Sequence, residues 1–534
     1  MNETTQKLAT LSRRDFIRNA VAISAASALP VSSQEMKVAR GLTKSSLNNV
    51  DIKNISKDNI VKLSAVELSS AIKSKVISCR EVMLAYLAQI NRVNPQFNAI
   101  VALQDTNTLL AQADKYDNEL ASGQYRGWMH GFPLAVKDLA RVNGITSTSG
   151  SPLFKDYIPS RDDIFVERLK AAGGIIIGKT NVPEFGLGSQ SYNPVYGVTL
   201  NAYDGKSTAG GSSGGAATAL ALNLVPVADG SDMMGSLRNP AAYNNVIGFR
   251  PSFNRVPFGP TKEVFLQQLG INGPMGKTVE DVAMLLSTMA GSDQRTPLVS
   301  EQDPDIFTQS LNSDVKGLRI GWLGDFDGYL PMEADVLATC ERSLRFFEQI
   351  GCSVEKVSVD YPMEKLWKTW LLHRHWLIAG LAGPLYADPK NHLLMKPELL
   401  WEIEGAKQYS AQDVFNASIE RSKWYQTLEK LYQTYDFLVL PTAQVFPFDA
   451  NIHWPKEIAG KKMDTYHRWM EVVIGGTLSG CPAINVPAGF GGKENKPMGI
   501  QIWGPMNADL QVLKMAYAYE QASRWNLDYP TPFA

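Results

Sequence analysis

The sequence has almost no net charge, few cysteines and no apolar run long enough to span a membrane. Lys plus Arg number 52 against 53 for Asp plus Glu, so the 534-residue chain carries a formal net charge of −1. Without a basic field over the whole protein, nucleic acid is not expected as its main partner. Four cysteines are too few to hold a chain of this size with disulfides, and no Cys-x-x-Cys or His-rich cluster indicates a metal site. The sequence therefore predicts neither a metal nor another cofactor.

The composition is that of a globular protein of enzyme size. Hydrophobic residues make up 44% of the chain and charged residues 20%. These values exclude disorder for most of the chain, and they also exclude collagen, a coiled coil and a multi-span membrane protein. Stable association with a membrane is not expected.

Residues 1–33 are typical of a cleavable export signal. A pair of arginines, Arg13 and Arg14, is followed by a weakly apolar run over 20–29 and by small residues. This order of basic, apolar and small regions resembles a twin-arginine signal, which directs folded proteins across a membrane. The alternative is a basic N-terminus that holds two arginines by chance. We predict a signal peptide here, an N-terminal extension over 34–59, and a periplasmic or secreted protein.

Two capping boxes predict helices near the start of the folded chain. Ser64 precedes Glu67 by three residues, and Ser78 precedes Glu81 by the same spacing. In this pattern the serine side chain accepts from the N–H three residues on, and the glutamate returns the contact. The second helix is expected to end near Pro95, because proline breaks the helical hydrogen-bond ladder.

From about residue 130 onward, short apolar runs divided by glycine-rich turns alternate with helical stretches. Such alternation predicts an α/β fold, here one large domain over 60–534 with a central mixed β-sheet flanked by helices. The expected strands are 132–136, 174–177, 224–228, 318–322, 437–440, 483–486 and 499–503, and the expected helices include 164–172, 279–289 and 333–350.

Residues 361–470 form a region rich in aromatic side chains. It holds seven of the 11 Trp and five of the six His. Two interpretations are open: a helical layer packed on the sheet, or the wall of a substrate pocket. A helix at a membrane surface is a third, but Lys365, Lys368 and Arg374 are too few basic residues for it.

The four cysteines leave one pairing open. Cys340 and Cys352 flank an expected helix-to-strand turn and would pair only in an oxidising compartment. Cys79 and Cys481 lie in apolar contexts and are expected to pack as small hydrophobic residues.

Two Gly/Ser-rich segments, 209–215 and 230–238, lie within 130–260 and carry the candidate chemistry. The first opens a helix of small residues, whose first amides are free to donate. The second follows an expected strand, so its polar side chains lie at a strand's carboxyl end, where α/β proteins often place their sites. A phosphate-binding loop is disfavoured, because no Gly-Lys-Ser/Thr follows the glycines.

A nucleophile elbow around Ser212 is formally matched by Gly210 and Gly214. That elbow needs a strand directly before it and a histidine after it. Residues 202–206 are instead typical of a turn, and the nearest histidines are His130 and His373.

Lys137 offers a base that needs no histidine. It directly follows an apolar run. Burial in an apolar wall lowers the pKa of a lysine from its usual value of about 10.4. A neutral lysine can then activate a serine, either directly or through a second hydroxyl that relays the proton.

Lys137 and the two Gly/Ser-rich segments together resemble the amidase signature family. Ser212 lies 75 residues after Lys137, and Ser236 lies 24 residues after Ser212, as in that family. Further matching pieces are Gly178-Lys-Thr-Asn, Asn239-Pro-Ala-Ala, Gly248-Phe-Arg-Pro, Leu440-Pro-Thr and Pro497-Met-Gly-Ile-Gln-Ile. The resemblance covers 60–534 and implies the family's single-domain fold.

The resemblance implies a Ser-Ser-Lys triad. Ser236 would be the nucleophile, Ser212 the relay serine that follows a cis peptide bond, and Lys137 the neutral terminal base. The reaction implied is acyl transfer from an amide to Ser236, followed by hydrolysis to a carboxylic acid and ammonia or an amine. The expected partner is a small-molecule amide, and a homodimer is compatible with the family.

Residues around the triad would support this chemistry. The oxyanion hole would consist of backbone amides, those of Met233, Met234, Gly235 and Ser236. Asp232 and Arg238 would orient the loop, and Ser213 would hydrogen-bond to Lys137.

The chain departs from the family at Met234-Gly235, which stands where the family has Gly-Gly. A methionine at a position that needs a positive φ would be strained, and its thioether would reshape the acyl pocket. A catalytically impaired, amide-binding protein is therefore one alternative function, and a His-dependent serine hydrolase is another. The family's tRNA-dependent amidotransferase is disfavoured by the export signal and the near-neutral charge.

Overall fold

The computed structural model of the protein describes residues 57–525, and these belong to one compact unit. The predicted signal segment over 1–33 and nearly all of the predicted extension over 34–59 lie outside the described residues.

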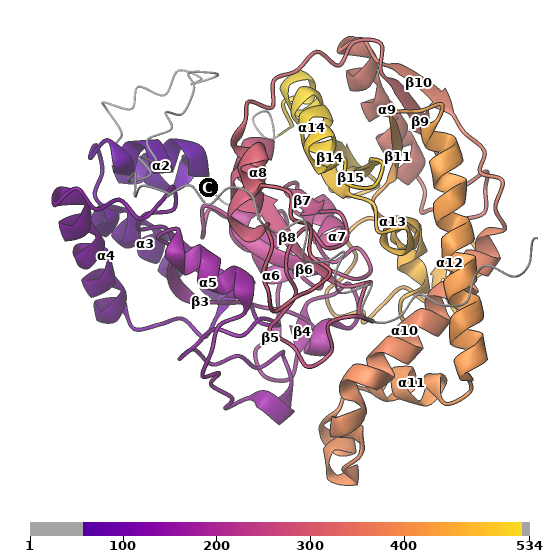
Figure 1. The fold of residues 1–534 in the computed structure, drawn as a ribbon, viewed down its shortest axis with the longest axis horizontal. Coiled ribbons are helices and arrows are strands. Elements are labelled where there is room, and N and C mark those ends of the chain that lie inside the picture. Colours follow the sequence, from indigo (N-terminus) through magenta and orange to yellow (C-terminus); the bar gives the residue numbers. More distant parts are fainter. Residues whose placement is uncertain (1–56, 526–534) are drawn as a thin grey trace, which may run out of the picture. The chain divides into compact units, whose positions relative to one another are not determined.

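The largest element is an eight-stranded mixed sheet (Figure 1). Its strand order is β10 (Ser353–Lys356), β9 (Arg319–Trp322), β11 (Phe437–Pro441), β15 (Lys496–Trp503), β14 (Ala483–Gly491), β7 (Ile247–Arg250), β8 (Ile271–Gly276) and β6 (Ala228–Asp232). The first three strands run parallel to one another, and every later neighbour is antiparallel. The predicted α/β fold with a central mixed sheet is therefore confirmed.

A second sheet of three strands contacts the edge strand β6. Its order is β1 (Ile100–Val101), β3 (Ile175–Thr180) and β2 (Pro133–Lys137), with β2 parallel to β3. Two short hairpins complete the strands: β4 (Tyr192–Asn193) with β5 (Gly197–Val198), and β12 (Glu457–Ile458) with β13 (Lys461–Lys462).

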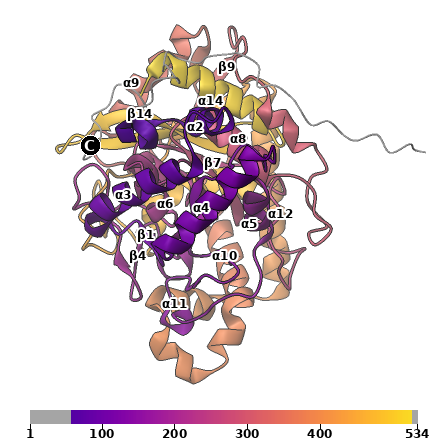
Figure 2. The ribbon, with the colours of Figure 1, turned by 90° about the vertical axis from the view of Figure 1, so that its left-hand side faces the viewer.

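Helices pack against these sheets, with α7 on β14 and β15, α8 on β8, and α9 and α14 on β14. The α-helices are α2 (Ala65–Lys73), α3 (Cys79–Phe97), α4 (Thr106–Ala121), α5 (Ile164–Ala171), α6 (Gly214–Ala221), α7 (Arg238–Tyr243), α8 (Val279–Met289), α9 (Val336–Gln349), α10 (Met363–Tyr386), α11 (Pro397–Ala406), α12 (Ala411–Tyr432), α13 (Ile474–Ser479) and α14 (Asp509–Ser523). Short 3₁₀ helices are η2 (Lys57–Lys62), η3 (Pro152–Phe154), η4 (Glu184–Gly186), η5 (Pro304–Thr308), η6 (Pro389–Leu394) and η7 (Arg468–Val473). Figure 2 shows the view in which α2 to α5 face the reader.

Both predicted capping boxes are present, at the starts of α2 and α3. The helix α3, predicted to end near Pro95, ends at Phe97, two residues later. The Asn94 side chain accepts from the N–H groups of Ala99 and Ile100, and Asn98 takes the left-handed conformation. These contacts end the helix at Phe97, two residues beyond the proline.

The predicted strand over 224–228 is also misplaced. These apolar residues form the turn that leaves α6, where the N–H of Leu224 bonds to the carbonyl of Ala219. The strand β6 begins only at Ala228 and consists mostly of polar residues. Its sequence does not indicate a strand, because most of its residues are not apolar. The strand is buried by the elements packed around it.

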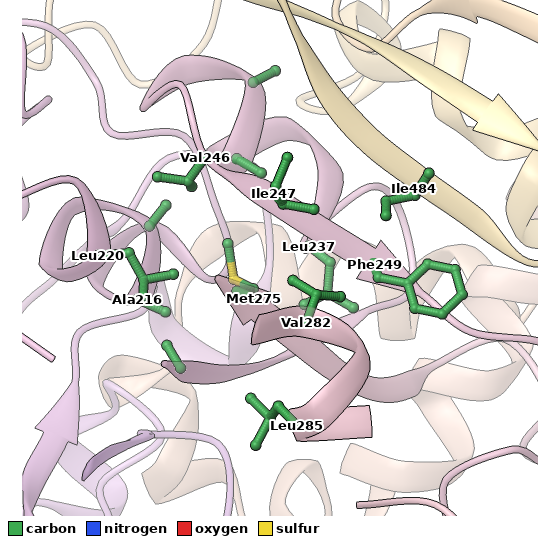
Figure 3. Close-up of a cluster of buried hydrophobic side chains, with 14 of the residues drawn as sticks. Ala216, Leu220, Leu237, Val246, Ile247, Phe249, Met275, Val282, Leu285 and Ile484 are labelled. Carbon is green, nitrogen blue, oxygen red and sulfur yellow. The ribbon is translucent and has the colours of Figure 1, made fainter. Parts of the chain in front are cut away.

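A buried apolar cluster supports the segment that follows β6 (Figure 3). Leu237 lies among side chains from α6, β7, β8, α8 and β14, which include Ala216, Leu220, Ile247, Phe249, Met275, Val282, Leu285 and Ile484. A Cβ on Gly230, Gly248 or Gly273 would collide with Leu237. These three glycines, one on each of β6, β7 and β8, let the loop lie flat on the sheet.

The aromatic-rich region 361–470 contains α10, α11 and α12, drawn in orange in Figure 1. Trp367, Trp370, Trp424 and Trp469 are each less than 2% exposed. The interpretation as a packed helical layer is therefore confirmed for these four, whereas Trp401 is 39% exposed.

All four cysteines are buried free thiols, so Cys340 and Cys352 form no disulfide. Cys79 and Cys481 pack in the interior, as expected for small hydrophobic residues. Within residues 57–525, none of the helices is both long enough and apolar enough to cross a membrane.

Candidate active site

Lys137 ends strand β2 and is only 1% exposed. Its Nζ lies 2.9 Å from Ser212 Oγ and 2.7 Å from Ser213 Oγ. Burial lowers the pKa of this lysine to about 7, against the opposing effect of the nearby carboxylates of Asp229 and Asp232. The amine can therefore exist in its neutral form near neutral pH while hydrogen-bonded to two serines.

Ser231 also contacts the amine. It lies in the second Gly/Ser-rich segment, but no role was predicted for it from the sequence. Lys137 Nζ lies 3.0 Å from its Oγ and 3.2 Å from its carbonyl oxygen. A neutral amine donates two hydrogens and keeps one lone pair. Ser231 and Ser213 can accept the two hydrogens, which leaves the lone pair for the Ser212 hydroxyl. Because β6 runs from Ala228 to Asp232, Ser231 lies on this strand and not in the loop after it.

The Ser212 loop lies at the start of α6. The peptide bond between Gly211 and Ser212 is cis, as the resemblance implied. Ser189 Oγ donates to the carbonyl of Gly211 at 2.7 Å, and the N–H of Ser213 donates to the carbonyl of Ser236 at 3.2 Å. The second bond joins the two Gly/Ser-rich segments directly.

Ser236 is 7% exposed and lies in the turn between β6 and α7. The carboxylate of Asp232 accepts from the N–H of Gly235 at 2.9 Å and from that of Leu237 at 3.2 Å. Gly235 has a φ of +76°, and a Cβ there would collide with Asn239 Oδ1. The turn thus requires glycine at this position.

The four amides assigned to the oxyanion hole are not equivalent. The N–H of Gly235 already donates to Asp232. Within the described part of the chain, the N–H groups of Met233, Met234 and Ser236 donate to no protein oxygen. These three amides are therefore free to bind a developing negative charge.

Met234 does not carry the strain considered for it. The positive φ falls on Gly235, and Met234 is absent from the residues with positive φ. Its side chain is 4% exposed and belongs to the apolar core. The neighbouring Met233 is the one that reaches α10, where its Sδ lies 3.5 Å from a guanidinium nitrogen of Arg374.

Asp232 is held by two arginines. Its carboxylate is 3.0 Å from Nε of Arg238 and 3.5 Å from Arg250, and all three side chains are fully buried. Burial alone would raise the pKa of Asp232, but the two guanidinium groups lower it to about 2. Arg238 also donates to Gln501 Oε1 at 2.7 Å, which ties the turn to β15.

Replacing Arg238 with methionine should lower the free energy of unfolding by about 3 to 5 kcal/mol, because it strips a buried carboxylate of its main partner. Denaturant unfolding of the purified variant measures this. The control is Arg295→Met, which removes an exposed arginine that pairs with Glu167 and Asp293. This control should cost about 1 kcal/mol or less. Equal losses in the two variants would contradict the anchoring role of Arg238.

No histidine within residues 57–525 hydrogen-bonds to Ser212 or Ser236. His130 instead contacts the carbonyl of Tyr116 and the N–H of Arg126. Isolated bridges at Ser207 and Thr208, rather than a strand, precede Ser212. The structure therefore excludes the nucleophile elbow. Among the described residues, no group of three or more His, Cys, Asp or Glu side chains is arranged to hold a metal.

In this α/β protein, a lysine with a lowered pKa contacts a serine loop that is hydrogen-bonded to a turn with free amides. Such an arrangement can activate a serine without histidine. The Amidase family model matches residues 81–513. The chain belongs to this family, the amidase signature enzymes, and is a hydrolase acting on carbon–nitrogen bonds.

The relatives of this chain include acylamidases and amidotransferase subunits. An acylamidase of Rhodococcus erythropolis is 32% identical over 461 residues, which cover 85% of this chain and 94% of that protein. A glutamyl-tRNA(Gln) amidotransferase component from Alkaliphilus metalliredigens (strain QYMF) is 30% identical over 472 residues, covering 84% and 94%. The crystal structure of a bacterial aryl acylamidase of the amidase signature family has a TM-score of 0.80 and 28% identity, covering 88% of this chain and 99% of that one.

Proposed function

We propose that the protein hydrolyses a carboxylic amide to an acid plus ammonia or an amine, through an acyl-enzyme on Ser236. The contact that carries this proposal is the 2.9 Å distance between Lys137 Nζ and Ser212 Oγ, at a lysine whose pKa is about 7. The hydrogen bond from the Ser213 N–H to the Ser236 carbonyl supports it, because it holds the serine loop against the nucleophile's turn.

The proposed reaction has balanced proton transfers. Neutral Lys137 accepts the Ser212 proton while Ser212 accepts the Ser236 proton, and Ser236 Oγ attacks the amide carbonyl. The amides of Met233, Met234 and Ser236 stabilise the resulting oxyanion. The proton held by Lys137 returns through Ser212 to the leaving nitrogen, and the C–N bond breaks. Water then repeats the sequence on the acyl-enzyme and releases the acid.

The proposed substrate is a small amide met outside the cytoplasm, such as a peptide C-terminal amide, a linear or cyclic oligoamide or an aryl amide. The names of the acylamidase relatives support an acyl or aryl amide. The twin-arginine pattern supports a periplasmic or secreted location. Amidotransferase activity is the second candidate because of relatives such as that of Alkaliphilus metalliredigens, but the net charge of −1 favours a substrate without tRNA.

Peptide mapping by mass spectrometry after treatment with a fluorophosphonate tests the proposal. We expect one adduct, on Ser236, together with release of ammonia or an amine from at least one member of a panel of small amides. An adduct on Ser212 alone would contradict the assignment of the nucleophile. A folded protein that is neither labelled nor active on the panel, but is stabilised by an amide, would instead indicate the amide-binding alternative.

A further inference from the structure

Asp229 is a buried carboxylate that the mechanism above does not use. It lies on β6 and is 3% exposed. Its two carboxylate oxygens lie 3.3 and 3.2 Å from the backbone nitrogen of Lys137, which donates to them. A carboxylate buried beside the residue that carries the candidate base has a direct physical effect on that base.

The geometry of β2 explains why this N–H is available. The N–H of Asp138 donates to the carbonyl of Thr180 on β3 at 3.0 Å. Because neighbouring N–H groups of a strand point to opposite edges, the N–H of Lys137 points away from β3. It therefore faces β6, where the carboxylate of Asp229 accepts it in place of a strand carbonyl.

Two lysines from neighbouring strands act on Asp229, namely Lys137 on β2 and Lys179 on β3. Asp232, also on β6, acts on Lys137 in the same direction as Asp229 does. Lys179 is further balanced by Asp138, whose carboxylate lies 3.7 Å from its Nζ, and by Asp163. Burial raises the pKa of Asp229 to about 6, although the Lys137 N–H and the two lysines oppose this.

We propose that Asp229 is a positioning residue for the base: its carboxylate fixes the backbone of Lys137, and its negative charge strengthens the hold of the amine on a proton. This inference rests on the proposed function, since it takes Lys137 as the base. Burial by itself would leave the amine a weak base, and the negative charge that Asp229 carries above its pKa of about 6 restores the amine's proton affinity toward neutral pH. Asp229 touches neither the serines nor the substrate in this scheme.

The test compares the pH dependence of the fluorophosphonate labelling rate in wild type and in Asp229→Asn. The asparagine oxygen can still accept from the Lys137 N–H, so the variant removes the charge and keeps the hydrogen bond.

The rate of labelling should rise with pH as Lys137 loses its proton. Without the carboxylate, the rise of the labelling rate with pH (the rising limb of the pH profile) should move to lower pH by about one unit. The plateau should fall several-fold, because the base is weaker. The variant should then label faster than wild type between about pH 6 and 7, where Asp229 is still ionised in wild type, and more slowly at alkaline pH.

Asp281→Asn is the matched control. Asp281 is another buried aspartate whose pKa burial raises to about 6, and it accepts from a backbone N–H of a different element, that of Val66, at 3.1 Å. Its lysine partner is Lys277, and no triad residue contacts it. Asp281→Asn should lower stability and leave the limb at the wild-type pH. Asp229→Ser serves as a second uncharged variant if Asp229→Asn does not fold.

The outcomes separate the inference from the proposed function. A shifted limb in the Asp229 variant alone supports the inference. An unshifted limb in that variant, or an equal shift in the Asp281 control, overturns it while the proposed function stands. Wild-type labelling that shows no rising limb and is unaffected by replacing Lys137 would overturn the proposed function, and the inference with it.

Discussion

Replacing Ser236 with alanine is expected to abolish covalent labelling and to reduce amide turnover by at least about 10⁴-fold. The hydroxyl is the proposed site of the acyl bond, and it lies in the turn where the N–H groups of Met233, Met234 and Ser236 donate to no protein oxygen in the described part of the chain. Within that same part of the chain, Ser236 Oγ makes no hydrogen bond to the protein, so the free energy of unfolding should change by about 0.5 kcal/mol or less. Labelling, turnover and a thermal melt measured on one preparation test both parts.

Ser479→Ala is the matched control for this prediction. Ser479 is a buried serine on α13 whose Oγ donates to the carbonyl of Gly476 at 3.0 Å, and it contacts no residue of the site. Its replacement should leave labelling intact. If Ser236→Ala retained wild-type labelling, the nucleophile would have to be sought elsewhere, first at Ser212.

Replacing Lys137 with methionine is expected to lower labelling and turnover by about 10²- to 10⁴-fold, the range that a lost general base produces. Methionine nearly preserves the volume of the lysine stem but has no amine to accept the Ser212 proton. The variant should remain folded, because it removes a buried amine whose charged form is disfavoured by burial. The residual rate should also lose its rise with pH near 7, which a structural role of the lysine would not predict.

Lys277→Met controls for the removal of a lysine with a lowered pKa. Burial lowers the pKa of Lys277 to about 8, and its Nζ donates to Asn223 Oδ1 at 2.8 Å and to carbonyl groups of the segment before α2. This variant should lose stability but keep its labelling rate. A Lys137 variant that labels as fast as the Lys277 variant would exclude lysine as the base.

Interactions between residues close in sequence were predictable from the sequence. The capping boxes at Ser64 and Ser78 form as expected, because each joins groups three residues apart and depends little on the rest of the fold. The alternation of strands and helices predicted the α/β class, because each apolar run that indicates a strand or a helix lies within a short stretch of sequence. The strand β6 consists mostly of polar residues, so the pattern of apolar runs did not identify it. The roles of Ser231 and Asp229, which lie on this strand, were therefore not predicted.

For the candidate site too, some features follow from the sequence and others only from the tertiary structure. The sequence by itself determined which residue types could act and their spacing, namely Lys137, Ser212 and Ser236 within the two Gly/Ser-rich segments. Only the tertiary structure decided that Lys137 contacts Ser212, Asp229 and Ser231, which are 75, 92 and 94 residues away. It also decided that Gly235 gives its N–H to Asp232 and not to a substrate. These contacts depend on β2 lying beside β6, and pairing between distant strands is set by the packing of the whole sheet, which no local pattern encodes.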